Sequence, residues 1–200
     1  DGANNTSAAS GGLVITIDTQ SPTATITLAD SELTAGETAL VTFTFSEAIT
    51  GFNNDDLTVA NGSLSAVSSS DNGITWTATF TPSADTTSVS NVITLSNAGV
   101  TDTAGNAGTG TTNSGNYTVD TLRPTATIVL ADTELNIGKT SLVTITFNRA
   151  VSGFDNADLS ADNGTLTAVT SSDGGITWTA TFTPTANITA TSNVITLDNS

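Results

Sequence analysis

The chain has 200 residues, of which 19 are acidic and three are basic, and its formal net charge is −16. This charge argues against binding to nucleic acid or to anionic membranes, because both need clustered cations. Cys and His are absent, which excludes disulfides, thiolate metal sites and enzymes that depend on a histidine base.

Strands dominate the expected secondary structure, beginning with a strand-like segment at 12–17. Alternation of apolar and polar residues is typical of a strand with one buried face. The clearest case is 74–81, where Thr alternates with Ile, Trp, Ala and Phe. Asn61-Gly62 lies between two alternating runs and predicts a two-residue hairpin turn. The pattern predicts strands at 23–28, 39–45, 56–60, 63–68, 74–81, 91–96 and 115–119.

The chain repeats itself at an offset of 102 residues, so that 18–23 returns as 120–125. A period of this length fits one whole small domain and is too long for a solenoid unit. We therefore expect an all-β chain of tandem immunoglobulin-like β-sandwiches in line, with about seven strands each. The expected domains span 18–120 and 121–200.

Residues 1–17 resemble the end of the first domain, and the second domain lacks a last strand of its own. Two explanations are open. The chain is a window from a longer array, or residues 12–17 of one subunit complete the second domain of the next by donor-strand complementation. In the second case Leu13, Ile15 and Ile17 form the inserted apolar face. We expect this strand to be paired, because an unpaired apolar strand promotes aggregation.

Acidic residues are expected at the two ends of each sandwich. The end where the chain enters the first domain (the entrance end) collects Asp18, Glu47, Asp55, Asp56, Asp71 and the loop 102–106. The end where it leaves (the exit end) collects Asp30, Glu32, Asp85 and Asp120. Carboxylate oxygens without His or Cys favour Ca²⁺ over Zn²⁺ or Cu²⁺. The alternative is that these carboxylates are solvated and only maintain solubility.

One substitution between the repeats and two prolines refine this expectation. Arg149 replaces Glu47 in the second repeat, so any metal site at the second entrance end must differ. Pro22 and Pro124 fix φ and restrict the residue before them, which predicts short, stiff linkers with or without a metal.

A carbohydrate-binding surface or a catalytic site finds little support in the sequence. Stacking on sugars needs exposed aromatic rings, and only Phe52, Phe154 and Tyr117 are candidates. Trp76 and Trp178 alternate in phase with core residues and are expected inside the sandwich. We expect no enzymatic activity.

Four motifs together resemble a known family. They are Asp-Thr-x-x-Pro-Thr at 18–23, Thr-Phe-Thr-Phe-Ser-Glu-Ala-Ile-Thr-Gly-Phe at 42–52, Thr-Trp-Thr-Ala-Thr-Phe-Thr-Pro at 75–82 and Asp-Thr-Ala-Gly-Asn at 102–106. As a set they resemble bacterial Ig-like (BIg) repeats, which fill the extender regions of giant RTX-type and biofilm-associated surface adhesins. The resemblance covers essentially the whole chain.

The resemblance implies non-catalytic modules that project a distal binding domain from the cell surface, often rigidified by interdomain Ca²⁺. Carried over to matching positions, the implied metal residues are Asp18, Asp102 and Asn106 at one end and Asp30, Glu32 and Asp120 at the other. The implied location is extracellular, on the cell surface or secreted. The expected partners are neighbouring Ig-like repeats or identical subunits, and the alternatives are an extracellular filament built by strand donation and a carbohydrate-binding module.

Overall fold

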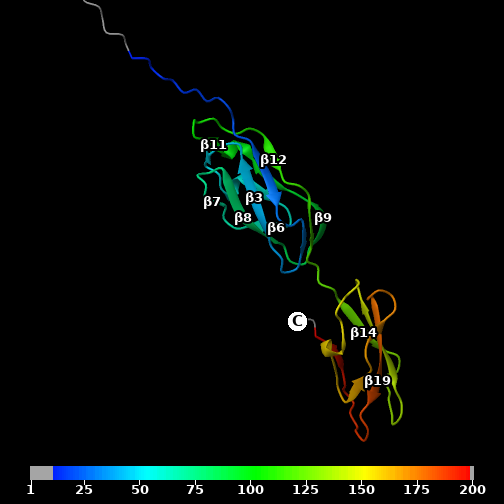
Figure 1. Ribbon diagram of the computed structural model, residues 1–200. Coiled ribbons are helices and arrows are strands. Elements are labelled where there is room, and N and C mark those ends of the chain that lie inside the picture. The colour runs from blue at the N-terminus through cyan, green and yellow to red at the C-terminus, as the bar shows by residue number, and fades with distance from the viewer. Residues whose placement is uncertain (1–10, 199–200) are drawn as a thin grey trace, which may run out of the picture. The chain divides into compact units, whose positions relative to one another are not determined.

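The computed structural model describes residues 11–198, and the chain divides into two units between Leu122 and Arg123 (Figure 1). Strands and short 3-10 turns make up the regular structure of both units, which confirms the all-β prediction. Within the described residues, no helix is long and apolar enough to cross a membrane.

The first sheet of unit 1 has the strand order β1-β3-β8-β6, and β7 also pairs with β8. In the central strand β3, Val41, Phe43 and Phe45 are buried, whereas Leu40 is 52% exposed on the other face. The predicted strand 74–81 is confirmed as β8, which pairs antiparallel with β3. The strands are β1 (Ala24–Leu28), β3 (Ala39–Phe45), β6 (Gly62–Leu64), β7 (Ser68–Ser69) and β8 (Thr75–Pro82).

The opposite layer of unit 1 is made of shorter sheets with the orders β12-β10-β5, β2-β13-β9 and β11-β4. Strand β13 lies between two partners, parallel to β2 and antiparallel to β9. Alternation missed β2, β4, β11 and β12 because two or three residues are too few to show a period, and it also missed most of β9, whose residues are mainly polar. The bounds are β2 (Glu32–Thr34), β4 (Ile49–Thr50), β5 (Leu57–Val59), β9 (Thr87–Asn91), β10 (Ile93–Ser96), β11 (Thr101–Asp102), β12 (Thr111–Asn113) and β13 (Tyr117–Asp120), with 3-10 turns η1 (Asn54–Asp56) and η2 (Asn97–Gly99).

Unit 2 repeats the first sheet in the order β14-β15-β19-β17, with β18 also on β19. Val143 pairs with Ala180 there, as Val41 pairs with Ala78 in unit 1. Its other described strands are β16 and β20, which pair with each other, and the segments equivalent to β2 and β9 form no strand. The bounds are β14 (Ala126–Leu130), β15 (Ser141–Phe147), η3 (Asn156–Asp158), β16 (Leu159–Ala161), β17 (Gly164–Leu166), β18 (Thr170–Ser171), β19 (Thr177–Pro184) and β20 (Ile195–Leu197).

Phe52 is the centre of an aromatic cluster in the core of unit 1. Its ring meets Phe43, Phe45 and Trp76 edge to face, with centroid distances of 5.2, 5.4 and 5.3 Å. Such pairs stabilise a core beyond the area that they bury. The indole N–H of Trp76 donates to the carbonyl oxygen of Gly73 at 3.1 Å, so the polar end of this half-buried ring is also satisfied. In unit 2 the same geometry links Phe147, Phe154 and Trp178.

The hairpin predicted at Asn61-Gly62 is wrong. The flanking strands β5 and β6 belong to different sheets, so the chain crosses here from one layer to the other. Asn61 has the expected positive φ, 50°, but Gly62 already belongs to β6. Gly62 is needed because a Cβ would lie 2.3 Å from the ring of Phe80. The glycine therefore serves close packing on the core.

Candidate functional site

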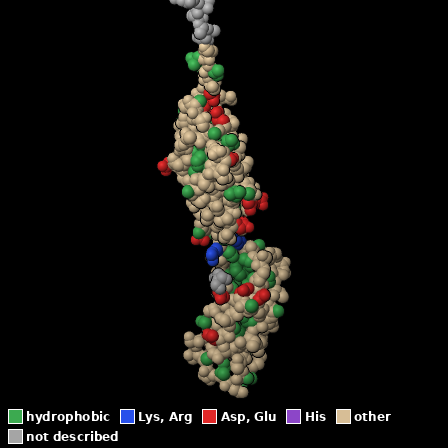
Figure 2. Space-filling view, turned by 60° about the vertical axis from the view of Figure 1, so that its left-hand side comes forward, with side chains coloured by type: hydrophobic (Ala, Val, Ile, Leu, Met, Phe, Trp, Pro, Cys, Tyr) green, Lys and Arg blue, Asp and Glu red, His purple; other side chains and the backbone are tan. Residues whose placement is uncertain are grey.

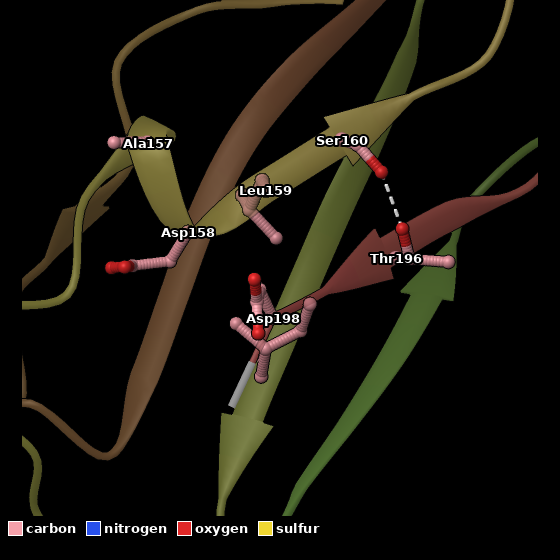
Figure 3. Close-up of a pocket in the computed structure, with 7 residues that line it drawn as sticks. Ala157, Asp158, Leu159, Ser160, Thr196 and Asp198 are labelled. Atoms are coloured by element: carbon pink, nitrogen blue, oxygen red, sulfur yellow. Dashed lines mark hydrogen bonds between the residues drawn. The ribbon is translucent and has the colours of Figure 1, made fainter. Parts of the chain in front are cut away.

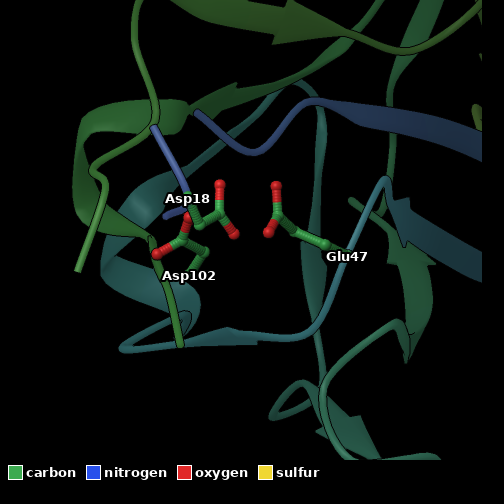
Figure 4. Close-up of side chains that lie close together, drawn as sticks. All are labelled: Asp18, Glu47 and Asp102. Carbon is green, nitrogen blue, oxygen red and sulfur yellow. The ribbon is translucent and has the colours of Figure 1, made fainter. Parts of the chain in front are cut away.

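Three carboxylates meet at the entrance end of unit 1 (Figure 4). One oxygen from each of Asp18, Glu47 and Asp102 lies within 4.8 Å of the other two. Over residues 11–198 this is the only group of three or more acidic side chains that lie so close together. The structure thus brings together two of the predicted metal residues, Asp18 and Asp102, and adds Glu47.

Asp102 is the buried member of the cluster, with 3% of its surface exposed. It ends β11, where it pairs with Ile49 of β4. Its carboxylate accepts hydrogen bonds from the backbone N–H of Ala104 at 2.9 Å and of Asn106 at 2.7 Å. The side-chain amide of Asn106 donates a third bond at 2.8 Å. These bonds fix the loop that follows β11 and the direction of the Asp102 carboxylate.

Asn106 also connects this loop to the linker that precedes β1. Its Nδ2 donates to the backbone oxygen of Asp18 at 3.3 Å. The backbone N–H of Gln20 donates to Oδ1 of Asp18 at 3.1 Å, which orients that carboxylate. Asn106 was predicted as a metal residue, and in this structure its amide nitrogen positions Asp102 and Asp18.

Glu47 comes from the turn between β3 and β4. Because β1 pairs with β3, with Ala24 opposite Phe45, the residues after β3 lie beside the linker before β1. The backbone N–H of Thr23 donates to Oγ of Ser46 at 3.0 Å, which fastens the two segments together. Glu47 had been placed at the entrance end but not among the metal residues. Its position just after the strand that pairs with the first strand was the signal that could have identified it.

The carboxylates of the cluster influence each other's protonation. Burial raises the pKa of Glu47, and the charges of Asp102 and Asp18 raise it further. Burial also acts to raise the pKa of Asp102, but hydrogen bonds from Asn106, Gly105 and Ala104 outweigh it and lower that pKa. Asp102 therefore stays ionised while the Glu47 anion is disfavoured. A bound cation would remove this repulsion.

The donor set of the cluster fits a hard divalent cation. Three side chains each offer carboxylate oxygen, and the chain has no His or Cys that would favour Zn²⁺ or Cu²⁺. Ca²⁺ accepts carboxylate and backbone oxygens in flexible geometry and keeps water ligands. Asp18, Glu47 and Asp102 are the residues that would hold it.

A family model for bacterial Ig-like domains matches residues 18–119 and again 120–200. The chain belongs to the bacterial Ig-like domain family. This confirms the prediction of immunoglobulin-like domains in tandem.

Comparison with curated protein sequences gives no significant match. Among solved structures, the chain is similar to FdeC, an Escherichia coli adhesin, with 18% identity and a TM-score of 0.39 over 82% of this chain and 55% of that one. It is also similar to the Yersinia pseudotuberculosis adhesin InvE, with 17% identity and a TM-score of 0.38 over 80% of this chain and 51% of that one. The chain spans about half the length of both structures.

The second Ig-like repeat builds its entrance end from different residues. Arg149 stands where the first repeat has Glu47, and Asn148 stands where it has Ser46. Asn148 keeps the structural role, since its Oδ1 accepts a hydrogen bond from the N–H of Thr125 at 3.0 Å. The fastening of the linker is thus conserved between the two Ig-like repeats, while the charge at the cluster position is reversed.

The remaining predicted metal residues lie at the exit end of the first Ig-like repeat. Strand β13 places Thr118 opposite Glu32 and Asp120 opposite Thr34. Oδ1 of Asp30 accepts a hydrogen bond from the N–H of Glu32 at 2.9 Å. Within residues 11–198, Asp30, Glu32 and Asp120 do not form a group like that at the entrance end.

The aromatic rings of the Ig-like repeats pack in the cores of the two units. Phe52 and Phe154 are 4% and 9% exposed, and Tyr117 is fully buried, so the three candidates for sugar stacking form no surface platform. Asp56 closes a capping box with Asn53 at the start of η1, which gives this carboxylate a structural role. On the face shown in Figure 2, acidic side chains lie in several small groups separated by uncharged surface.

Proposed function

We propose that the two Ig-like repeats form part of the stalk of a bacterial cell-surface adhesin and are non-catalytic. A stalk needs modules that repeat in tandem through short linkers, and this chain has two such modules joined without an insertion. The proposed location is extracellular, and the proposed partners are neighbouring Ig-like repeats. A more distant part of the protein would carry the ligand-binding region.

We further propose that Ca²⁺ bound by Asp18, Glu47 and Asp102 stiffens the junction at the entrance end. The supporting observation is that Asp18 belongs to the linker, whereas Glu47 and Asp102 belong to the body of the domain, yet their carboxylates lie within 4.8 Å. A cation between them would attach the linker to the domain. Pro22 already restricts the backbone of the linker. Fixing the linker with a metal would therefore cost little additional conformational entropy.

Amide hydrogen exchange tests the stiffening. In the full chain, the amides of Thr19, Gln20 and Ser21 should exchange more slowly in excess Ca²⁺ than in EGTA, because attachment of the linker suppresses local opening. The amides of β15 in unit 2 provide the internal control and should not change. Equal exchange of the three linker amides in both conditions would contradict a metal-stiffened junction.

Antibody labelling tests the proposed location. Antibodies raised against the first Ig-like repeat should label intact cells of the source organism without permeabilisation, and brief protease treatment of intact cells should remove the label. Labelling that requires permeabilised cells would rule out a surface stalk.

A further inference from the structure

We propose that unit 1 carries tension along the chain and that strands β2 and β13 form the clamp that resists it. The inference rests on the proposed stalk role, because a stalk under load is pulled through its linkers. It goes further than that role, since it assigns the mechanical resistance of unit 1 to named contacts.

The chain enters unit 1 at one end and leaves it at the opposite end (Figure 1). On the entrance side, the linker at 18–23 leads into β1. On the exit side, β13 ends at Asp120 and the next linker follows. Tension therefore pulls β1 towards the entrance end and β13 towards the exit end.

The segment before the entrance linker takes no part in the clamp. The strand predicted at 12–17 is not formed in this structure. Leu13, Ile15 and Ile17, which were expected on its apolar face, are 87%, 71% and 80% exposed. Force on this side reaches unit 1 along the backbone and enters the fold at β1.

Strand β2 follows β1 in the chain and pairs with β13, with Glu32 opposite Thr118 and Leu33 opposite Val119. Over residues 11–198 this is the only parallel strand pair. In an antiparallel pair the pulled ends would lie together, and the interstrand bonds would open one after another. In this parallel pair they lie at opposite ends. The pull slides one strand past the other and loads the interstrand hydrogen bonds together.

The inner face of the clamp is packed in the core. Leu33 and Val119 are each 1% exposed, and Tyr117 is fully buried. The ring of Tyr117 meets that of Phe80 edge to face at a centroid distance of 5.0 Å, and its hydroxyl donates to the carbonyl oxygen of Ala60. Sliding of β13 towards the exit end would pull this ring away from both contacts. The side chains therefore resist the same motion as the backbone hydrogen bonds.

Thr121 fixes the end of β13 at the point where force leaves unit 1. It is 5% exposed. Its hydroxyl donates to the carbonyl oxygen of Ser83 at 2.6 Å and accepts a hydrogen bond from the N–H of Thr86 at 3.0 Å. Its own N–H donates to the carbonyl oxygen of Thr86 at 2.8 Å. These bonds connect the end of β13 to the loop between β8 and β9, which the linkers do not pull directly.

The entrance side has a similar attachment. The N–H of Ser46 donates to the carbonyl oxygen of Thr23 at 2.9 Å, and the N–H of Thr23 donates to Oγ of Ser46 at 3.0 Å. This pair of bonds ties the linker to the end of β3, which is the partner of β1. Unit 2 repeats it between Asn148 and Thr125 at 2.9 and 3.0 Å. Both points where force acts on unit 1 are thus held by hydrogen bonds.

Strands β5, β6 and β10 lie outside the path of the load. β5 pairs with β10, with Thr58 opposite Thr94, and β6 pairs with β8. The first pair recurs in unit 2 as β16 and β20, where Ser160 and Thr196 share a hydrogen bond (Figure 3). These strands stay in place while β2 and β13 separate. Substitutions there should change the free energy of unfolding with little effect on the force that opens unit 1.

Single-molecule force spectroscopy of the full chain in EGTA tests the clamp. The chain has no Cys, so introduced Cys residues define where the handles attach. The pair Gln20→Cys/Arg123→Cys pulls unit 1 as the linkers would. The pair Ala35→Cys/Arg123→Cys separates the neighbouring exit-side ends of β2 and β13, so that their bonds open one after another. At the same loading rate, the first pair should require several times the unfolding force of the second.

Equal unfolding forces for the two handle pairs would overturn the proposal. This result is distinguishable from failure of the stalk role, because a surface stalk without the clamp would still be labelled on intact cells. Calcium does not contribute to either measurement, since EGTA is present throughout.

Variants at Thr121 test the exit attachment with the handles at residues 20 and 123. Thr121→Val removes the hydroxyl and should lower the unfolding force, whereas Thr121→Ser keeps the hydroxyl and should retain it. Gly62→Ala in β6 is the control, since it should lower the free energy of unfolding in urea and leave the force unchanged. Full force in Thr121→Val, or an equal loss of force in Gly62→Ala, would contradict a clamp held by Thr121.

Discussion

The carboxylate of Glu47 lies within 4.8 Å of that of Asp102, and Asn106 holds Asp102 in place through both its backbone and its side-chain N–H groups. The proximity of Glu47 and Asp102 brings together two loops that are far apart in the sequence. It also leaves Glu47 beside the negative charges of Asp102 and Asp18. Burial has the largest effect in raising the pKa of Glu47, and these two charges raise it further. A cation is the simplest partner for such a pair.

Replacing Glu47 by the residue of the second repeat should abolish the effect of calcium on stability. A ligand held at 100-fold over its Kd adds about 2.7 kcal/mol to the folded state, and about 1 kcal/mol moves the Tm of a domain this size by roughly 4–8 °C. We therefore expect excess Ca²⁺ to raise the Tm of unit 1 by about 10 °C or more. In Glu47→Arg the guanidinium replaces the cation, so Tm should be the same in Ca²⁺ and in EGTA.

Two further variants make this result specific. Glu47→Gln should be more stable than the unchanged chain in EGTA, because it removes the repulsion, and should gain less from Ca²⁺. Glu134→Gln, which removes an exposed carboxylate of unit 2, should leave the calcium effect unchanged. A calcium shift of full size in Glu47→Arg would exclude this cluster as the site.

The acid stability of the fold should depend on Asp71 and Asp173. Backbone hydrogen bonds from Thr75 and Thr177 respectively lower the pKa of each carboxyl from 3.8 to about 2. The unfolded chain then binds more protons than the folded chain between these values. The stabilisation is thus complete above about pH 4 and is lost as pH falls towards 2. Asp71→Asn should flatten the decline of unfolding free energy of unit 1 over that window, measured by urea denaturation, and an unchanged slope would contradict the assignment.

Gly62 should be intolerant of a side chain. A Cβ there would lie 2.3 Å from the ring of Phe80, so Gly62→Ala forces the core of unit 1 to shift and should cost about 1–3 kcal/mol by urea denaturation. Gly164→Ala should do the same to unit 2, where a Cβ would lie 2.2 Å from Phe182. Gly115→Ala is the control, since nothing lies within 4 Å of the added atom. If Gly62→Ala leaves the unfolding free energy of unit 1 unchanged, the contact between residue 62 and Phe80 is not tightly packed.

The long strands could be predicted from the sequence because their alternation of apolar and polar residues reflects which side chains are buried. The alternating faces of β3 and β8 follow from the residues themselves. The strands β2 and β9 could not be found in this way. They exist where β13 supplies hydrogen-bonding partners, and the equivalent segments of unit 2 have the related sequence but no strand. Their structure depends on a tertiary contact that local sequence does not contain.

The candidate site was predicted only in part, and the reason is similar. Asp18 and Asp102 were identified from the motifs that contain them, and the reversal of charge at Glu47 was visible in the repeat. That Glu47 completes the cluster depends on the register of β1 against β3. The misassigned hairpin at Asn61 has the same cause, since the sequence shows a turn but not which sheet each flanking strand joins.

The most direct test of the proposed calcium site is isothermal titration of the full chain with CaCl₂ after removal of divalent metals. We predict saturable binding that includes one site per chain which disappears in Glu47→Arg and persists in Glu134→Gln. Absence of saturable binding to the unchanged chain, or an isotherm for Glu47→Arg identical to that of the unchanged chain, would contradict a calcium-stiffened stalk built on Asp18, Glu47 and Asp102.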